Sequence, residues 1–173
     1  MITTASSLNT YTQCPRRYEY TYIKERISSE DPAALLVGSA VHIGCERFWL
    51  KESCGEAIHR TVDFMRSSDF WETERGRLEI GRVMAYLHGY YRHREHMLNL
   101  YDVVAVEREW EKTIGGVQFA GKIDLVLRDT KGRLILVDHK TSASSDVDKP
   151  GSSFWRQLNY DTQMILYREA LSG

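Results

Sequence analysis

The stretch GKIDLVLRDTKGRLILVDHKTS, residues 121–142, decides the fold of this chain of 173 residues. It holds two apolar runs separated by Asp129–Arg133. That segment fits a three-residue hairpin loop in which Gly132 takes the left-handed conformation. If Asp129 pairs with Arg133, Lys131 is the centre of the register. The stretch therefore predicts two antiparallel strands with a fixed pairing.

This register brings charged side chains together. Counting seven residues in each direction from Lys131 sets Asp124 opposite Asp138, with Cβ atoms ~4.5 to 5.5 Å apart. The side chain of Lys140, two residues beyond Asp138, points to the same face of the sheet. Two carboxylates that close would repel and raise a pKa unless a divalent cation lies between them, and Mg²⁺ or Mn²⁺ prefers oxygen ligands. The alternative is a structural cluster at a solvated strand end. The residues alone leave both interpretations open.

The second half of the chain, from about residue 101, has strand periodicity followed by a helix. Asp102–Ile114 and Val117–Asp129 predict two strands joined by a turn at Gly115-Gly116, and Arg133–Thr141 predicts a third. A loop over 142–153 precedes a helix over roughly Phe154–Leu171. Its expected core positions are Leu158, Met164, Ile165 and Leu171.

The first half predicts helices. The first is a short helix through Gln13, capped by Ser6 or Ser7, and the second is Arg16–Lys24. The third runs from Asp31-Pro32 to about Ser53 and has an apolar face formed by Val41, Cys45, Phe48 and Trp49. The last two are Glu56–Arg66 and Phe70–Met97. This order predicts an α+β fold, a mixed α/β sandwich. We expect a single domain over 1–173, with a helical part (1–100) and a sheet with a closing helix (101–173).

Composition limits the class of protein. With 42% hydrophobic and 27% charged residues the chain can bury a core, which excludes disorder, collagen and low complexity. No apolar run has the length of a membrane span and the start lacks a signal pattern, so we expect a soluble, cytoplasmic protein with no membrane contact. The net charge of −1 excludes a polybasic coat for nucleic acid but not a nucleic-acid enzyme. Three cysteines without a CxxC pair predict reduced thiols.

Five motifs follow one another between residues 4 and 167. They are Ser6-x-Leu8-x-x-Tyr11-x-x-Cys14-Pro15-x-x-Tyr18, Gly38-Ser39-Ala40-Val41-His42, Val106-Glu107, Gly121-x-Ile123-Asp124 with Val137-Asp138-x-Lys140-Thr141, and Gln163-x-x-x-Tyr167. In this order they resemble the PD-(D/E)xK nuclease superfamily, in particular its RecB-like exonuclease branch, which includes CRISPR-associated and AddB-type nuclease domains.

The resemblance implies a restriction-endonuclease-like core with an antiparallel meander and an extended helical N-terminal half. It implies roles for seven residues: metal ligation by His42, Asp124, Asp138 and the backbone carbonyl of His139, activation of the attacking water by Lys140, and contacts to a substrate phosphate or the site carboxylates from Gln163 and Tyr167. The cofactor would be Mg²⁺ or Mn²⁺.

One position matches the family pattern only weakly, and another departs from it. Glu107 is a weaker match, because on a regular strand it shares a face with Glu109 and Glu111 and is then only a solvated edge. Relatives with an iron-sulfur cluster use a cysteine at the place of Cys14 together with three beyond the last helix. No cysteine follows Cys54 here, so no cluster is expected and Cys14 is predicted to be a buried thiol. Because the given chain ends at Gly173, soon after the last of the motifs, we expect a minimal family member or a trimmed chain.

The resemblance also implies a function. It is a metal-dependent deoxyribonuclease, an exonuclease acting on DNA ends or single strands in recombination, repair or replication of a bacterial or phage-infected cell. The alternatives are a structure-specific endonuclease, a CRISPR-adaptation-type nuclease, and a catalytically silent module that binds nucleic acid or a partner. The partners would be DNA and a helicase or recombination protein, with the oligomeric state open. Residues 88–96 (HGYYRHREH) are the best candidate for an exposed binding surface, although most aromatic residues are expected in the core.

Overall fold

The computed structural model describes residues 2–26, 33–142, 149–152, 155–156 and 161–172. The chain divides into two compact units. We call Asp31–Glu107 with Asp124–Thr141 the helical unit. The terminal unit consists of Met1–Glu30, Arg108–Ile123 and Ser142–Gly173. The expected single domain over 1–173 stays a prediction.

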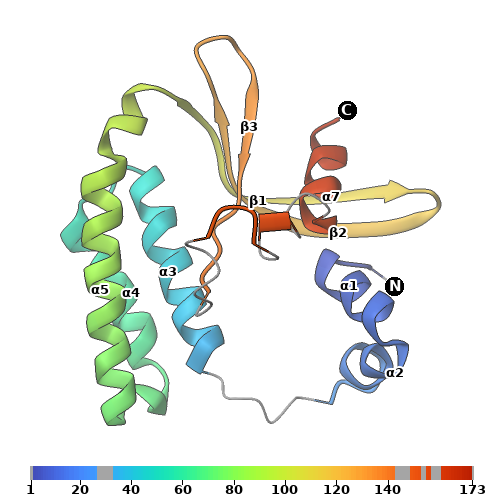
Figure 1. Ribbon diagram of the computed structural model, residues 1–173, viewed down its shortest axis with the longest axis horizontal. Coiled ribbons are helices and arrows are strands. Elements are labelled where there is room, and N and C mark those ends of the chain that lie inside the picture. The colour runs from blue at the N-terminus through green and yellow to red at the C-terminus, as the bar shows by residue number, and fades with distance from the viewer. Residues whose placement is uncertain (1, 27–32, 143–148, 153–154, 157–160, 173) are drawn as a thin grey trace. The chain divides into compact units, whose positions relative to one another are not determined.

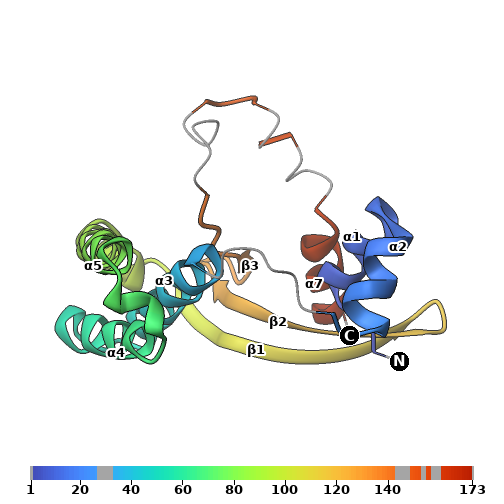
Figure 2. The same ribbon diagram turned by 90° about the horizontal axis from the view of Figure 1, so that it is seen from below.

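Three helices build the core of the helical unit: α3 (Ala33–Trp49), α4 (Cys54–Arg66) and α5 (Glu74–Arg94), which lie side by side in Figures 1 and 2. The expected apolar face of α3 is confirmed, because its four predicted residues are at most 5% exposed. They pack in two clusters, one with α4 and α5 and one with the strands. This packing fixes α3 against the sheet, which is what positions the site.

Capping residues set the ends of these helices. α4 begins at Cys54, two residues before the predicted start, because Ser53 and Glu56 form a capping box. The predicted helix over Phe70–Met97 is wrong in extent. Thr73 caps α5 through the N–H of Gly76, and short 3₁₀ segments lie on either side of α5, Asp69–Glu72 (η2) and Glu95–Asn99 (η3).

Two glycines of α5 offer a matched test of packing in this unit. A Cβ added at Gly76 would lie 2.0 Å from the carbonyl oxygen of Phe70, whereas a Cβ added at Gly81 would meet no described heavy atom within 4 Å apart from its chain neighbours and the nearby backbone of α5 itself. We expect Gly76→Ala to lower the free energy of unfolding by about 1–3 kcal/mol, as overpacking does. Gly81→Ala should raise it by about 0.4–1 kcal/mol. Urea unfolding followed by circular dichroism measures both, and effects of the same sign would contradict the packing described.

The sheet has the order β1-β2-β3, from β1 (Asp102–Ile114), β2 (Val117–Arg128) and β3 (Leu134–Val137). The antiparallel pairs of β2 and β3 run from Leu125↔Val137 to Arg128↔Leu134. This confirms the predicted register, and the loop agrees with it. The N–H of Asp129 donates to the carbonyl of Arg133 at 3.0 Å, and Gly132 has φ 79°. The turn at Gly115-Gly116 is confirmed, with φ values of 56° and 82°.

The third strand is shorter than predicted. It ends at Val137 instead of continuing to Thr141. Beyond Val137 the backbone N–H of His139 donates to the side-chain carboxylate of Asp124 at 2.8 Å. In a continued strand this N–H would instead donate to a backbone carbonyl. The chain therefore leaves the sheet where the charged residues begin.

The terminal unit contains α1 (Ala5–Gln13), α2 (Pro15–Tyr18), the π-helix η1 (Glu19–Ile23) and α7 (Thr162–Leu171). The cap of α1 is Thr4, not Ser6 or Ser7, because Thr4 and the buried Ser7 form a capping box. The preceding Thr3 bridges to Phe119 of β2, so the start of the chain is joined to the sheet (Figure 2).

The closing helix differs from its prediction. α7 begins at Thr162, where Asp161 caps it, and part of the predicted segment, including Leu158, lies outside the described residues. The buried residues of α7 are Leu166 and Tyr167. Ile165 is 50% exposed, so its predicted place in the core is wrong. The hydroxyl of Tyr167 donates to the carbonyl of Lys122 on β2, and this contact sets the rotation of the helix.

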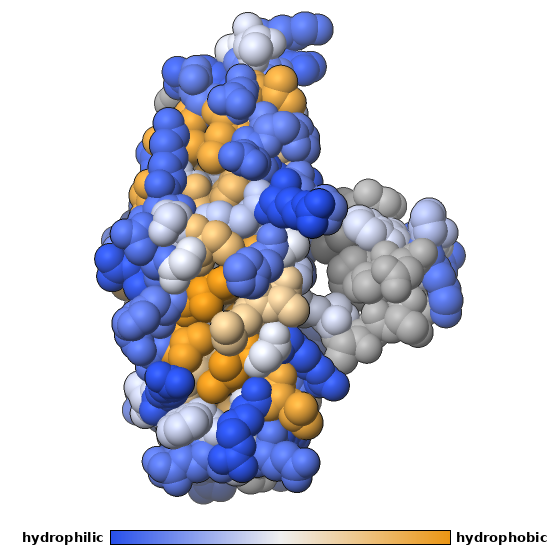
Figure 3. Space-filling model, turned by 90° about the vertical axis from the view of Figure 1, so that its left-hand side faces the viewer, coloured by the Kyte–Doolittle hydropathy of each residue, from blue (hydrophilic) through white to orange (hydrophobic). Residues whose placement is uncertain are grey.

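No helix among the described residues is long and apolar enough to cross a membrane. The surface of the helical unit seen in Figure 3 carries apolar patches between charged side chains. On α5 the side chains of Leu78 and Tyr86 are 59% and 47% exposed.

Candidate metal centre

Three side chains of the helical unit converge from different elements. They are His42 of α3, Glu107 of β1 and Asp124 of β2, and one ligand atom of each lies within 4.8 Å of the other two. The Nδ1 atom of His42 is 3.3 Å from Oδ2 of Asp124. An imidazole and two carboxylates at this spacing can hold a divalent cation.

Glu107 enters the cluster through an irregularity of β1. Its φ is 50°, a left-handed conformation that is rare for a residue other than glycine. The regular alternation breaks there, so Val106 packs on the core and Glu107 is turned to His42 and Asp124. The expectation that Glu107 is only a solvated edge is therefore wrong. Such strain costs about 1–3 kcal/mol and is concentrated at functional sites.

Asp124 is held as a carboxylate. It is 9% exposed, and burial alone would raise its pKa. Hydrogen bonds from His139, together with the nearby His42, outweigh burial and lower the pKa of Asp124 below its usual value. A buried carboxylate that stays ionised is an acceptor suited to a cation.

Asp138 and Lys140 form the second charged pair. Lys140 Nζ lies 2.8 Å from Oδ2 of Asp138, and the Asp138 side chain is only 8% exposed. Burial raises the pKa of Asp138, the Lys140 contact opposes this, and the negative charge of Asp124 adds to the rise. Continuing the observed register by one step sets Asp138 opposite Asp124. A cation between them would relieve this repulsion.

Sequence reasoning missed the role of the His139 side chain. Its ring nitrogen Nε2 lies 2.9 Å from the hydroxyl of Tyr90, and Trp49 Nε1 donates to the same hydroxyl at 2.8 Å. Burial raises the pKa of the Tyr90 phenol, so the hydroxyl keeps its proton. No sequence pattern links three positions this far apart in the chain.

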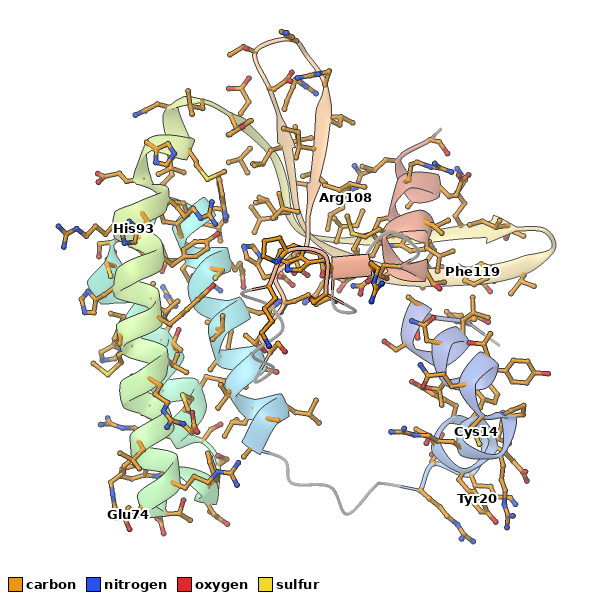
Figure 4. All side chains as sticks on the ribbon, viewed as in Figure 1. Cys14, Tyr20, Glu74, His93, Arg108 and Phe119 are labelled. Carbon is orange, nitrogen blue, oxygen red and sulfur yellow. The ribbon has the colours of Figure 1, made fainter. Side chains whose placement is uncertain are left out.

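The candidate binding surface over 88–96 is divided between core and solvent. Tyr90 and Tyr91 are half-buried and pack edge-on against Phe48, at 5.3 and 4.9 Å between ring centroids. Residues 92–96 are exposed, and His93 points outward from α5 (Figure 4). The two tyrosines of this stretch therefore belong with the core.

Gln163 and Tyr167 lie in the terminal unit. The Gln163 side-chain amide donates to the Tyr167 hydroxyl, which donates in turn to the Lys122 carbonyl. The Tyr167 ring is 4% exposed and packs edge-on against Trp110 at 6.4 Å. Their expected contact with substrate stays a prediction.

Cys14 is exposed, and its prediction as a buried thiol is wrong. The cause is its place before Pro15 at the start of α2. There its sulfur accepts a hydrogen bond from the backbone N–H of Arg17 at 3.4 Å. The thiol thus faces a helix end and not the core.

The donor set fits a hard or borderline divalent cation, because two carboxylates with one imidazole suit Mg²⁺ or Mn²⁺ and contain no thiolate. Comparison with known proteins points the same way. The model of the PD-(D/E)XK nuclease superfamily matches residues 3–173. No curated protein matches the chain.

Proposed function

Because the chain belongs to the PD-(D/E)XK nuclease superfamily, we propose that it is a metal-dependent deoxyribonuclease of the RecB-like branch, an exonuclease that hydrolyses DNA at ends or in single strands. The observation that carries the proposal is the convergence of His42, Glu107 and Asp124 next to the Asp138–Lys140 pair of the same unit. The pathway we propose is recombination, repair or replication, in association with a helicase or recombination protein.

In this proposal His42, Glu107 and Asp124 would hold the cation, and Asp138 and the carbonyl of His139 would supply further ligands. A bound Mg²⁺ or Mn²⁺ would lower the pKa of a water and offset the charge of the phosphate. The protein residues do the rest. Lys140, whose Nζ lies 2.8 Å from Oδ2 of Asp138, orients the attacking water by donating a hydrogen bond from its ammonium group. Its positive charge also stabilises the added negative charge of the transition state.

A polyanionic substrate is supported by a cluster of cations in the terminal unit. Arg16, Lys24 and Arg26 lie over the ring of Tyr20, with 5.8, 4.9 and 5.1 Å from charge to ring centroid. Tyr20 is labelled in Figure 4 on the π-helix that follows α2. Basic groups beside aromatic rings are the usual contacts of unpaired DNA, since they meet both phosphate and base.

The test is cleavage of end-labelled single-stranded, duplex and closed-circular DNA by the purified protein with Mn²⁺, Mg²⁺ or EDTA. We expect metal-dependent loss of linear but not circular DNA, absent in Asp138→Ala. Cutting of circles would instead indicate an endonuclease. DNA binding without cleavage under any metal would contradict the proposal and favour a silent binding module.

A further inference from the structure

Three side chains far apart in the chain form one line of hydrogen bonds behind the metal centre. Trp49 Nε1 lies 2.8 Å from the Tyr90 hydroxyl, and that hydroxyl lies 2.9 Å from His139 Nε2. Trp49 is 3% exposed and the His139 side chain 13%. The line ends at the residue whose backbone N–H donates to Asp124 at 2.8 Å.

The chemistry of the donors gives this line a direction. An indole nitrogen only donates, so the Tyr90 oxygen accepts from Trp49. Because a phenol oxygen can accept a second bond as well, the other side of the His139 ring decides the remaining direction. The carboxylate of Asp124 lies there and favours a proton on Nδ1, so that Nε2 accepts from the Tyr90 hydroxyl. In the neutral imidazole the proton of His139 is then on Nδ1. That atom is on the side of Asp124, 3.7 Å from Oδ2.

The backbone of His139 lies beyond the paired part of the sheet. β3 ends at Val137, so the pairing described for the sheet stops before this residue. The backbone N–H of His139 donates to Asp124, and its carbonyl, which belongs to the next peptide unit, is the group we propose as a metal ligand. A ring held at its far nitrogen limits rotation of the whole residue.

We propose that Tyr90 is a positioning residue of the metal centre, which through the ring of His139 fixes the backbone of His139 beside Asp124. The inference rests on the proposed function, because it assumes that the carbonyl of His139 faces the cation. Tyr90 itself contacts neither substrate nor cation in this account.

Tyr91 provides a matched control. Both tyrosine rings pack on Phe48. Among the described residues, however, the buried Tyr91 hydroxyl has no hydrogen-bond partner. Tyr90→Phe and Tyr91→Phe therefore remove the same atom from neighbouring positions, and only the first breaks the line to His139.

The first measurement is Mn²⁺ affinity by calorimetry, with kcat and KM for DNA. We expect Tyr90→Phe to weaken Mn²⁺ binding about tenfold or more and to lower kcat, with KM unchanged. Tyr91→Phe should stay within about twofold of the wild type, because removing a hydroxyl that has no hydrogen-bond partner among the described residues breaks no contact to the centre. A Tyr90→Phe protein equal to wild type, or an equal loss in both variants, overturns the inference.

A double-mutant cycle tests whether the effect passes through His139. His139→Leu removes the ring and keeps the peptide, so adding Tyr90→Phe to it should cause no further loss of Mn²⁺ affinity. Additive losses would mean that Tyr90 acts through packing instead, and would overturn the inference.

Histidine ¹⁵N NMR of the metal-free protein separates this inference from the proposed function. We expect the Nδ1–H tautomer of His139 in wild type and Tyr91→Phe, and its loss in Tyr90→Phe. An unchanged tautomer overturns the inference even if the protein cleaves DNA. A wild type that neither binds Mn²⁺ nor cleaves overturns the proposed function, and the tautomer then still decides whether Tyr90 orients His139.

Discussion

Asp124→Asn is expected to abolish metal-dependent cleavage, with a loss of about 10³-fold or more, as removal of a central electrostatic group does. Asparagine keeps the shape of the side chain and can still accept the N–H of His139. It loses the charge that faces His42 at 3.3 Å and that would hold the cation. The rate of release of end label and the Mn²⁺ affinity measure the effect.

Asp63→Asn is the control for this variant. Asp63 lies in α4, its side chain is 57% exposed, and it pairs with His59 at 3.0 Å. We expect its cleavage rate to stay within about twofold of wild type, as for surface changes generally. Circular dichroism checks that both variants fold. Folded Asp124→Asn protein that cleaves at the wild-type rate would show that Asp124 holds no catalytic cation.

Lys140→Gln is expected to separate metal binding from catalysis. Lys140 contacts Asp138 and in our proposal orients the attacking water and stabilises the charge of the transition state. Its loss should therefore lower kcat about 10²- to 10³-fold, the usual cost of removing one such group. Mn²⁺ affinity should not fall, because removing a positive charge does not weaken a cation site. Single-turnover cleavage and calorimetry measure the two quantities.

The matched control is Lys131→Gln, at the exposed loop between β2 and β3. Its side chain lies at the far end of the same hairpin, and we expect wild-type cleavage. If Lys140→Gln cleaves as fast as Lys131→Gln, Lys140 has no part in the reaction. If it loses Mn²⁺ binding as well, its role is to hold Asp138 in place for the cation.

The hairpin shows how far the sequence alone reaches. The pairing of β2 with β3 was predicted in the correct register, because a short loop with Gly132 at its left-handed position leaves few ways to align the strands. The apolar face of α3 was predicted for the same kind of reason, since helical periodicity is local. The hairpin register also identified Asp124, Asp138 and Lys140 as candidates, whereas His42 was identified only by the resemblance of its motif to that of a known family.

Local rules failed where a distant contact overrides them. The conformation of Glu107 breaks the alternation on which its solvated edge was predicted. Ile165 has the spacing of a core residue, yet the contact of Tyr167 with Lys122 turns it outward. Cys14 follows the helix-cap geometry before Pro15 and not its apolar character.

By itself the sequence determined the order of the elements and the hairpin register, because each depends on neighbours within a few positions along the chain. It also supplied the candidate site residues, in part through short motifs that resemble those of a known family. The tertiary structure alone decided that Glu107 joins His42 and Asp124, and that Tyr90 lies between Trp49 and His139. Those contacts join α3, α5 and the sheet. They depend on how packed surfaces meet, and periodicity along one element carries no information about that.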